Sequence, residues 1–393
     1  MTLVPISEAQ RRLFAAAAPI DVETVPIAAA AGRWAAADVS ARRTQPAADL
    51  SAMDGYAIRF ADLPGPWRVV GESAAGRPFA GTVGASEAAR IFTGAALPPG
   101  SDTVLIQEEA ARDGDRLSLS GEGPATCGRN TRRRGLDFGE GDRLVAAGER
   151  LTPARLAVAA TGGHGTLPVR RRVRVALVAT GDELVPPGTA IDGLALPESN
   201  RLMLAAMLAD LPVDLVDLGI LPDDLPTLTA AFAGVEADLL VTTGGASVGD
   251  HDLVRPALEA AGGTIDFWRI ALRPGKPMMA GRIGNASVLG LPGNPVSAFV
   301  TAILFVRPLV AHLAGAADPL PRTVTANLGE PLPANNARTD YLRGELRDGR
   351  AYASTIQDSS MLLTLARSTC LIVRAAGAPA AAAGDSAEIL PLG

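Results

Sequence analysis

The chain has 393 residues, of which 48% are hydrophobic and 20% charged, which is typical of a foldable protein of about two to four domains. Its net charge of −6 disfavours nucleic acid as the main partner, and its apolar stretches break before the roughly 20 residues that a membrane span needs. Two distant cysteines and three scattered histidines argue against a disulfide framework and a zinc site. No signal peptide is evident at the start of the chain, so we expect a cytoplasmic protein.

The first third of the chain has the pattern of a small β domain inserted into a linking domain. A short helix is expected near the N-terminus, followed by helical character from Val25 to about Ala37. Residues 46–128 are rich in glycine, proline and short β-like runs, and residues 129–170 then return to a helix. The sequence therefore predicts a linking domain made of residues 1–45 and 129–170, with the first helix free to pack on the next domain.

Three polar features of this first third have a structural and a functional interpretation. Asp54 precedes a glycine in a turn signal, and Thr93 ends a strand, where its hydroxyl could merely satisfy the backbone. Four arginines within six residues, Arg129 and 132–134, are followed by Asp137. Such a run is most often a solvated face, and the alternative is a clamp for an anion.

Residues 171–317 alternate strand and helix patterns and predict an α/β domain. Its first strand ends on a glycine followed by two acids, and its second strand precedes another acidic pair. Carboxylates at such turns suit Mg²⁺, which takes hard oxygen ligands and shares the rest with phosphate. The second pair could equally complement the dipole of the helix that follows it. The residues in question are Gly181, Asp182 and Glu183, and then Asp223 and Asp224.

Two further strand-to-helix turns of this domain are rich in glycine. The strand 238–243 leads into Gly244-Gly245 and a loop containing Ser247 and Gly249, where backbone N–H groups could approach an anion. Asp252 at the rim of this loop caps a helix or holds a metal ion. The second turn, Leu291-Pro292-Gly293-Asn294-Pro295, opens a long helix, and capping explains much of it. In a parallel sheet both turns open onto the same crevice.

Only one of the 36 basic residues is a lysine. Lys276 lies in the turn Arg273-Pro274-Gly275-Lys276-Pro277, whereas arginine supplies every other positive side chain. A compact ammonium differs from a guanidinium as a ligand for phosphate or another oxyanion, so we expect a functional lysine here. After this domain, residues 318–393 contain five short strand patterns and predict a C-terminal β domain.

These segments together resemble the molybdopterin molybdenumtransferase family, the molybdenum-insertion enzymes related to the gephyrin E domain. The resemblance covers residues 5 to 392 and rests on a set of motifs in this order: SAMDGYAIR, TGAALPPGSDTVLIQEE, NTRRRGLDFGEGD, ATGDEL, SNRLMLAAML, GILPDD, TTGGASVGDHD, RPGKP and GLPGNPVSAF. It implies a multidomain α/β plus all-β fold. This comprises a three-layer catalytic domain with a parallel-type sheet (171–317), an inserted β domain (46–128), the linking domain and a C-terminal β-barrel-like domain (318–393).

The resemblance also implies a reaction, a cofactor and partners. Adenylylated molybdopterin and molybdate would give molybdenum cofactor and AMP, with Mg²⁺ in a cleft that a second protomer completes. Transient contact with other cofactor-synthesis enzymes would follow. Carried over by motif, the acids of the site are Asp182, Glu183, Asp223, Asp224 and Asp252. Of these, Glu183, Asp224 and Asp252 are the expected metal ligands. Lys276 would bind phosphate or molybdate. The expected substrate-binding positions are Thr180, Gly181, Gly244, Gly245, Ser247, Gly249, Arg273, Pro292, Gly293, Asn294, Pro295 and Ser297. Asp54, Thr93, Arg132 and Asp137 would enter the cleft from the second protomer.

Two other functions fit parts of the pattern. The α/β domain alone also resembles the molybdopterin adenylyltransferases, but that function leaves the SAMDG and RRRG segments unexplained. A non-catalytic molybdopterin-binding or scaffold protein is the second alternative, and the retained acids and the lone lysine speak against it.

Overall fold

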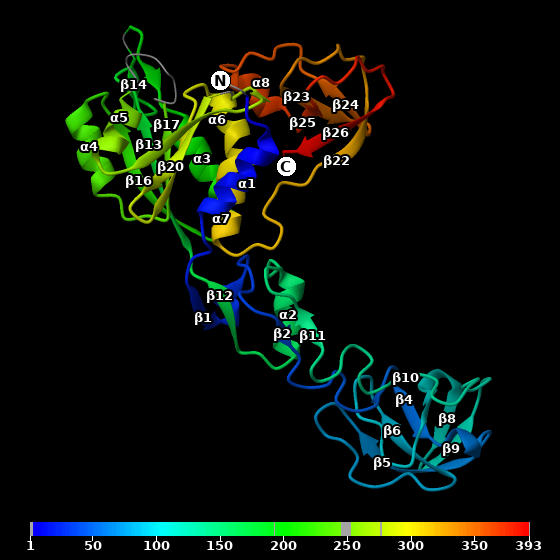
Figure 1. The fold of residues 1–393 in the computed structure, drawn as a ribbon. Helices are drawn as coiled ribbons and strands as arrows, with labels where there is room; N and C mark the ends of the chain where they lie inside the picture. Colours follow the sequence, from blue (N-terminus) through cyan, green and yellow to red (C-terminus); the bar gives the residue numbers. More distant parts are fainter. Residues whose placement is uncertain (1–2, 192, 245–252, 276, 393) are drawn as a thin grey trace.

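The computed structural model describes residues 3–191, 193–244, 253–275 and 277–392. The molecule is elongated: the α/β domain and the C-terminal β domain form one end, a narrow linking region follows, and a separate β unit lies at the far end (Figure 1). Most of the predicted architecture is therefore visible in the arrangement of the sheets.

The α/β domain is built on a six-stranded sheet with the order β16-β13-β17-β21-β20-β18. The pairings among the first four strands are parallel and the last two pairings are antiparallel, so the sheet is mixed, and β20 alone runs against the other five strands. The strands are β13 (Val173–Thr180), β16 (Val213–Leu221), β17 (Leu239–Thr243), β18 (Thr264–Arg269), β20 (Pro277–Ile283) and β21 (Ala286–Leu291). Two short strands, β14 (Leu184–Val185) and β15 (Leu196–Pro197), pair beside the sheet.

Helices cover both faces of this sheet, because its central strands are apolar on both sides. Along β13, Val175 and Leu177 belong to one buried cluster and Ala176 and Val178 to another. The first cluster packs against α1 (Ile6–Ala16), α3 (Asn200–Leu208), α6 (Pro295–Thr301) and α7 (Arg307–Leu313). The second packs against α4 (Leu225–Ala233) and α5 (Val254–Ala260). The expected three-layer catalytic domain is confirmed.

Helices α6 and α7 are joined by a π-helical turn, η4 (Ala302–Val306), into one buried rod. Pro308 lies just beyond this turn and has no N–H for the carbonyl of Leu304, four residues earlier, which explains the local distortion. Within the described residues this segment, Pro295–Leu313, is long and apolar enough by composition to cross a membrane, but 78% of it is buried inside the protein.

The linking region consists of two small ribbons and one helix. β1 (Val22–Pro26) pairs with β12 (Thr166–Arg170), β2 (Val39–Ser40) pairs with β11 (Arg143–Val145), and α2 (Pro153–Thr161) packs beside them. The prediction of helical character from Val25 to Ala37 is wrong. Only the 3-10 turn η1 (Ile27–Ala30) forms there, since Pro26 interrupts helical hydrogen bonding and β1 finds an antiparallel partner.

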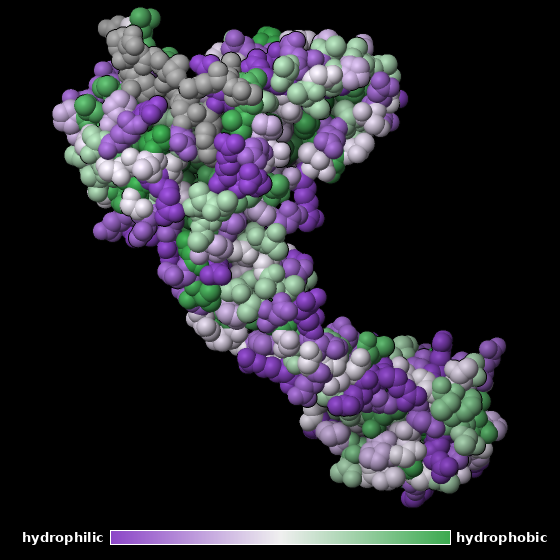
Figure 2. All heavy atoms as spheres, viewed as in Figure 1, coloured by the Kyte–Doolittle hydropathy of each residue, from purple (hydrophilic) through white to green (hydrophobic). Residues whose placement is uncertain are grey.

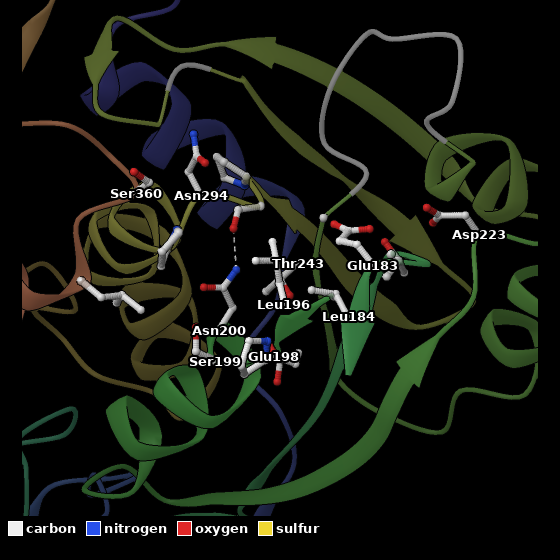
Figure 3. Close-up of a pocket in the computed structure, with 18 of the residues that line it drawn as sticks. Glu183, Leu184, Leu196, Glu198, Ser199, Asn200, Asp223, Thr243, Asn294 and Ser360 are labelled. Atoms are coloured by element: carbon white, nitrogen blue, oxygen red, sulfur yellow. Dashed lines mark hydrogen bonds between the residues drawn. The ribbon is translucent and has the colours of Figure 1, made fainter. Parts of the chain in front are cut away.

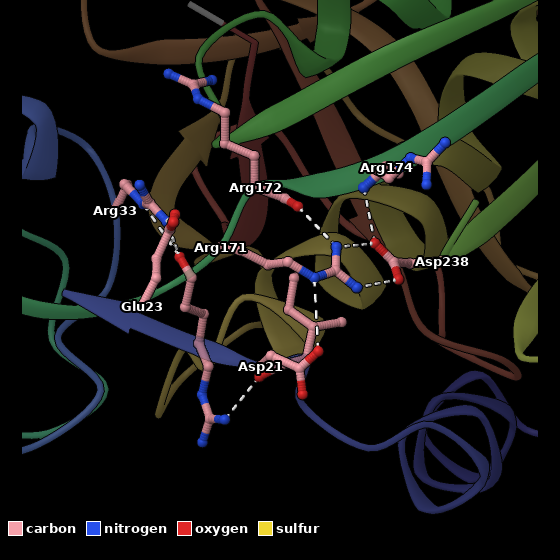
Figure 4. Close-up of polar contacts among 9 residues, drawn as sticks. Asp21, Glu23, Arg33, Arg171, Arg172, Arg174 and Asp238 are labelled. Atoms are coloured by element: carbon pink, nitrogen blue, oxygen red, sulfur yellow. Dashed lines mark hydrogen bonds and ion pairs between the residues drawn. The ribbon is translucent and has the colours of Figure 1, made fainter. Parts of the chain in front are cut away.

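A network of arginines joins the linking region to the α/β domain (Figure 4). The Arg171 guanidinium donates two hydrogen bonds, of 2.6 and 2.7 Å, to the carboxylate of Asp238 at the start of β17. It also lies 3.9 Å from the carboxylate of Asp21, just before β1. Buried Arg33 pairs with Glu23 and the Arg170 carbonyl. The two connecting strands are thus held at the amino end of β17, an interior strand of the catalytic sheet.

The far β unit has its own sheet and core. Its strand order is β7-β4-β6-β5-β9-β8, around buried Ile58, Trp67, Leu105 and Leu117. Its elements are β4 (Gly55–Ile58), η2 (Phe60–Asp62), β5 (Trp67–Ser73), β6 (Glu87–Ile91), β7 (Thr103–Ile106), η3 (Gln107–Glu109), β8 (Ala110–Asp113) and β9 (Arg116–Leu119). A short pair, β3 (Leu50–Ser51) with β10 (Thr131–Arg132), lies where the chain enters and leaves. We call this unit the distal β domain.

The C-terminal region closes into a five-stranded barrel, because β23 pairs with β25 in addition to the linear order β23-β24-β22-β26-β25. Its strands are β22 (Val324–Leu328), β23 (Thr339–Arg347), β24 (Arg350–Ala353), β25 (Cys370–Arg374) and β26 (Ser386–Pro391), with helix α8 (Leu362–Arg367) at one end. Strand β19 (Leu272–Arg273) of the α/β domain adds to β23 and links the two domains. The predicted barrel-like domain is confirmed.

Candidate active site

A cavity of about 730 Å³ opens at the carboxyl ends of β13, β17 and β21 (Figure 3). This is the place where an open α/β sheet binds its ligand. Many predicted positions line it together: Thr180, Gly181, Glu183, Asp223, Gly244, Pro292, Gly293, Asn294 and Pro295. The other lining residues come from β14, β15, the end of β17, the starts of α3 and β20, and the C-terminal domain: Leu184, Leu196, Pro197, Glu198, Ser199, Asn200, Thr243, Pro277, Ser360 and Leu362.

The floor of the cavity requires glycine at the end of β17. Gly244 has φ +91°, and a Cβ there would lie 2.5 Å from the Thr180 carbonyl oxygen on the neighbouring strand. A Cβ on Gly293 would lie 3.7 Å from Cα of Gly244, so the third turn packs against the second. Side chains are thus excluded where the three turns meet, which leaves room for a ligand.

Carboxylates form one side of the cavity, where Figure 3 shows Glu183 and Asp223 near each other. Asp182 approaches the same place, since its carboxylate accepts a 3.0 Å hydrogen bond from the backbone N–H of Asp223. Burial raises the pKa of Asp223 above its ordinary value, and the negative charges of Asp182 and Glu183 raise it further. The site therefore concentrates negative charge that a cation would relieve.

Asp224 has a different environment from Asp223. Its carboxylate accepts hydrogen bonds from the Thr227 hydroxyl at 2.6 Å and the Thr227 backbone N–H at 2.9 Å, so it caps helix α4. These bonds lower the pKa of Asp224. Asp224 does not line the cavity. Its side chain caps helix α4, as one of the two interpretations of the sequence expected.

The C-terminal barrel completes the opposite side. The Asn294 amide donates to the Ser359 hydroxyl at 3.1 Å, and the Val296 N–H donates to the Ser359 carbonyl at 3.0 Å. Ser360 and Leu362 of the same loop line the cavity. A loop from another domain therefore caps the start of α6 and closes the site.

Buried Arg343, only 1% exposed, holds this loop in place. Its guanidinium donates to the carbonyl oxygens of Asp358 at 2.7 Å and Ile356 at 3.2 Å. The Gln357 amide returns hydrogen bonds to the Arg343 and Ser354 carbonyls. Burial lowers the pKa of Arg343, because removal from water disfavours the charged guanidinium.

Sequence reasoning missed Glu198, Ser199 and Asn200 as cavity residues. Asn200 looks like an ordinary cap for α3, but its amide instead donates to the Gly293 carbonyl at 2.7 Å. Glu198 is 2% exposed, which is rare for an acid, and its Oε1 accepts from the Arg201 N–H at 2.8 Å. The sequence signal that could have identified them is the run of three polar side chains, an acid, a hydroxyl and an amide, directly before an apolar helix.

The positions expected to come from a second protomer lie in or beside the distal β domain. Asp54 accepts hydrogen bonds from the backbone N–H and hydroxyl of Thr93 at 2.7 and 2.8 Å, and these bonds lower its pKa. Arg132 and Asp137 are exposed. This group is at the opposite end of the molecule from the cavity of the same chain (Figure 1).

Other predicted positions do not line the cavity. Ser297 is buried in α6, and Arg273 forms an ion pair with Asp340 of the C-terminal barrel. Gly245, Ser247, Gly249, Asp252 and Lys276 lie outside the described residues. Among the residues that are described, no three His, Cys, Asp or Glu side chains gather at metal-binding distance.

Comparison with known proteins follows the same division of the chain. Family models described as "MoeA N-terminal region (domain I and II)", "Probable molybdopterin binding domain" and "MoeA C-terminal region (domain IV)" match residues 4–163, 176–312 and 325–392. The computed structure superposes on the molybdopterin biosynthesis moeA protein of Pyrococcus horikoshii with a TM-score of 0.85, 26% identity and full coverage of both chains.

Sequence relatives agree over nearly the whole length. The molybdopterin molybdenumtransferase of Haemophilus influenzae is 36% identical over 95% of this chain and 94% of its own. That of a Nostoc species is 33% identical over 95% of this chain and 89% of its own. The chain therefore belongs to the molybdopterin molybdenumtransferase family of transferases.

Proposed function

We propose that this protein inserts molybdenum into molybdopterin, with molybdate and adenylylated molybdopterin as substrates and AMP as a product. The observation that carries the proposal is the cavity where the three sheet turns meet. One side of this cavity is lined by carboxylates, and the turns beside them contain glycines whose backbone N–H groups suit phosphate. An enzyme of this class needs to hold two anions and a leaving phosphate in one place.

The chemistry asks for positioning rather than for a covalent nucleophile. A molybdate oxygen would form a bond to the adenylyl phosphorus, the bridging P–O bond would break, and its electron pair would leave on the molybdopterin phosphate. The two dithiolene thiols of molybdopterin would then bind molybdenum: one displaces AMP, which keeps the oxygen between molybdenum and phosphorus, and the other displaces one oxo oxygen, which leaves as water with the two thiol protons. The glycine turns at Gly244 and Gly293 would orient the phosphates through backbone N–H groups. Lys276 is the lysine that we expect beside them. Both cysteines lie outside the cavity lining, which agrees with a reaction that forms no thioester or thiol adduct.

The acidic side fits Mg²⁺ in the kind of donor it offers. Glu183 and Asp223 present hard oxygens to the cavity, and the pKa of Asp223 is raised by burial and then by the negative charges of Asp182 and Glu183, which a divalent cation would offset. We therefore assign Asp223, in place of the predicted Asp224, to this role beside Glu183. When bound, Mg²⁺ would neutralise charge on the pyrophosphate. Asp182 would position Asp223 through the hydrogen bond to its backbone.

We further propose that two chains form a composite site. Asp54 and Thr93 are hydrogen-bonded to each other at the end of the molecule far from the cavity. The space-filling view shows a concave side between the C-terminal barrel and the distal β domain (Figure 2). A second copy that fills this concavity would bring its own Asp54 and Thr93 to the cavity of the first, in a two-fold arrangement.

The test is release of AMP by the purified protein, given adenylylated molybdopterin, Mg²⁺ and molybdate. We expect molybdate-dependent release by the wild type, and its loss in Lys276→Ala and Asp223→Asn. Tight binding of the substrate without release would instead identify a binding or scaffold protein. Formation of adenylylated molybdopterin from ATP and free molybdopterin would move the protein one step earlier in the synthesis.

A further inference from the structure

Arg90, on strand β6 of the distal β domain, is held by four neighbouring groups. Its guanidinium carbon lies 5.2 Å from the centre of the Tyr56 ring and 4.8 Å from the centre of the Phe92 ring. Nη1 donates a 3.2 Å hydrogen bond to the Gly55 carbonyl, and Nη2 donates a 2.8 Å hydrogen bond to the side-chain oxygen of Gln107. Two cation–π contacts and two hydrogen bonds therefore restrain a side chain that is otherwise long and mobile.

The hydrogen-bond partners of Arg90 belong to the turn that carries Asp54, or hold it. Gln107, which accepts from Arg90 through its side chain, donates its backbone N–H to the Asp54 carbonyl at 3.1 Å. Arg90 itself holds the carbonyl of Gly55, the next residue. A side chain at position 55 is excluded, because a Cβ there would lie 2.0 Å from the Leu105 carbonyl oxygen. The backbone of the turn is thus fixed at two successive carbonyl groups.

The carboxylate of Asp54 has one committed oxygen and one free oxygen. Oδ1 accepts the backbone N–H of Thr93 at 2.7 Å and the Thr93 hydroxyl at 2.8 Å. Among the described residues, Oδ2 has no hydrogen bond or ion pair, and Asp54 is partly exposed. The hydrogen bonds from Thr93 lower the pKa of Asp54, and the charge of Arg90 lowers it further. The turn therefore leaves one ionised oxygen available to a second molecule.

A carboxylate that acts in the cavity of another protomer needs a rigid support, since a catalytic group has to be held within about 0.5 Å of its productive position. We propose that Arg90 is a positioning residue of the composite site: by joining Gly55 to Gln107 it holds the Asp54 carboxylate in the orientation that the cavity of the second copy requires. This inference rests on the proposed function and its composite site for the role of Asp54. Arg90 lies outside the motifs that predicted the site.

Hydrogen exchange of the free protein tests the positioning directly. Arg90→Met keeps an apolar stem between the two rings but removes the charge and both donors. The backbone N–H groups of Thr93 and Gln107, which both donate to Asp54, should then exchange about tenfold faster, as measured by mass spectrometry on peptides that cover them. Exchange in β8 and β9, at the other edge of the sheet, should not change.

AMP release tests whether this positioning serves the reaction. Arg90→Met should lower kcat about tenfold to a hundredfold, whereas KM should change less than about twofold, because the cavity that binds the substrate is intact. Arg90→Lys keeps the charge, but its single nitrogen cannot span the two acceptors as the guanidinium does, so it should recover only part of kcat.

Two variants of neighbouring strand β5 are the controls. Arg68→Met makes the same substitution at an arginine that forms only an exposed pair with Glu87 of β6, and it should change neither exchange nor kcat. Trp67→Phe disturbs the buried core of the distal β domain. It should lower the melting temperature and leave kcat unchanged at a temperature where the variant is folded, which separates loss of position from loss of folding.

Refolded mixtures show from which protomer Arg90 acts. Arg90→Met refolded with Asp223→Asn should recover about a quarter of wild-type activity, because half the dimers would carry one intact site. Arg90→Met refolded with Asp54→Asn should show no recovery, since every site would then meet a defective distal β domain.

Three results would overturn the proposal: unchanged exchange at Thr93 and Gln107 in Arg90→Met, full activity in Arg90→Lys, or a loss of kcat in Trp67→Phe equal to that in Arg90→Met. Failure of the proposed function gives a different pattern. If the wild type releases no AMP, the proposed reaction is contradicted, and the exchange rates still decide whether Arg90 fixes the turn.

The mixtures separate this inference from the composite site in the same way. Recovery by Asp54→Asn with Asp223→Asn, but not by Arg90→Met with Asp223→Asn, contradicts only the role of Arg90. Absence of recovery from both mixtures contradicts the composite site itself, and with it this inference.

Discussion

The side-chain amide of Gln10 donates a 2.8 Å hydrogen bond to the carbonyl oxygen of Leu304, and thereby replaces the helical partner that Pro308 cannot provide. Gln10 is 8% exposed and lies on α1. Gln10→Leu should therefore lower the free energy of unfolding by about 1–3 kcal/mol, since it leaves a buried carbonyl unpaired. Urea unfolding measures this. Arg12→Ala on the same helix removes only an exposed pair with Glu8 and should change the urea midpoint much less than Gln10→Leu does.

Asp223 should make the protein less stable as the pH rises. Its pKa in the folded state lies above the ordinary 3.8, through burial and then the charges of Asp182 and Glu183, so the folded protein binds this proton more tightly than the unfolded chain does. The resulting stability is fully present below pH 3.8 and is lost as the pH rises through the raised pKa. Asp223→Asn should consequently melt above the wild type at neutral pH, and the difference should shrink on acidification, in a series of thermal melts.

Asp224 should show the opposite sign. Hydrogen bonds from Thr227 lower its pKa, so its contribution is present above the ordinary pKa and is lost as the pH falls through the lowered one. Asp224→Asn should melt below the wild type at neutral pH and approach it in acid. If both Asn variants shifted the melting temperature in the same direction, the contrast between the two adjacent acids would be refuted.

Asp238 anchors the connection to the linking region. Burial favours its neutral form, but hydrogen bonds from the Arg171 guanidinium and the Arg174 N–H outweigh this, and the pKa of Asp238 is lowered. Asp238→Asn should reduce the free energy of unfolding by about 1–3 kcal/mol at neutral pH. Because the wild type loses its own carboxylate in acid, the deficit should narrow as the pH falls. Glu236→Gln, which affects only an exposed pair with Arg174, is the control.

Arg343 should act on substrate binding through the loop that it holds. Lysine cannot reproduce the fork of hydrogen bonds to the carbonyls of Ile356 and Asp358, so Arg343→Lys should loosen Ser359 and Ser360 at the cavity. We expect KM for the adenylylated substrate to rise more than kcat falls. Limited proteolysis should show earlier cleavage in residues 356–361, and an unchanged digest with an unchanged KM would contradict this role.

The composite site predicts complementation between two inactive proteins. Asp54→Asn and Asp223→Asn should each lack activity alone, whereas equal amounts, denatured and refolded together, should recover about a quarter of wild-type activity, because half the dimers would carry one intact site. Refolding of each variant alone is the control. Absence of recovery, with mixed dimers demonstrated by tagged copies, would place Asp54 and Asp223 in separate sites or in one chain.

The sequence predicted best what depends on local chemistry. Strands that end on Thr180 and Gly244 were recognisable because apolar runs stop at glycines, and parallel strands bring their carboxyl ends together. The sequence could not tell which of Asp223 and Asp224 faces the cavity, since that depends on the start of α4. Glu198 and Arg343 were not predicted because both are charged side chains that tertiary packing buries, and Arg343 holds a loop 13 to 15 residues further along the chain. The helix predicted after Val25 was overridden by pairing of β1 with β12.

The antiparallel pairing of β1 and β12 has a topological consequence. Val22 is the partner of Arg170, so the chain leaves the catalytic body and returns to it at adjacent points. The strands between them form an arm: none of them enters the six-stranded sheet of the catalytic domain, and the distal β domain at its end has a core of its own. A change in the length of that arm would alter the distance between Asp54 and the catalytic body without altering the cavity. The position of Asp54 and the residues that line the cavity can therefore vary independently in this architecture.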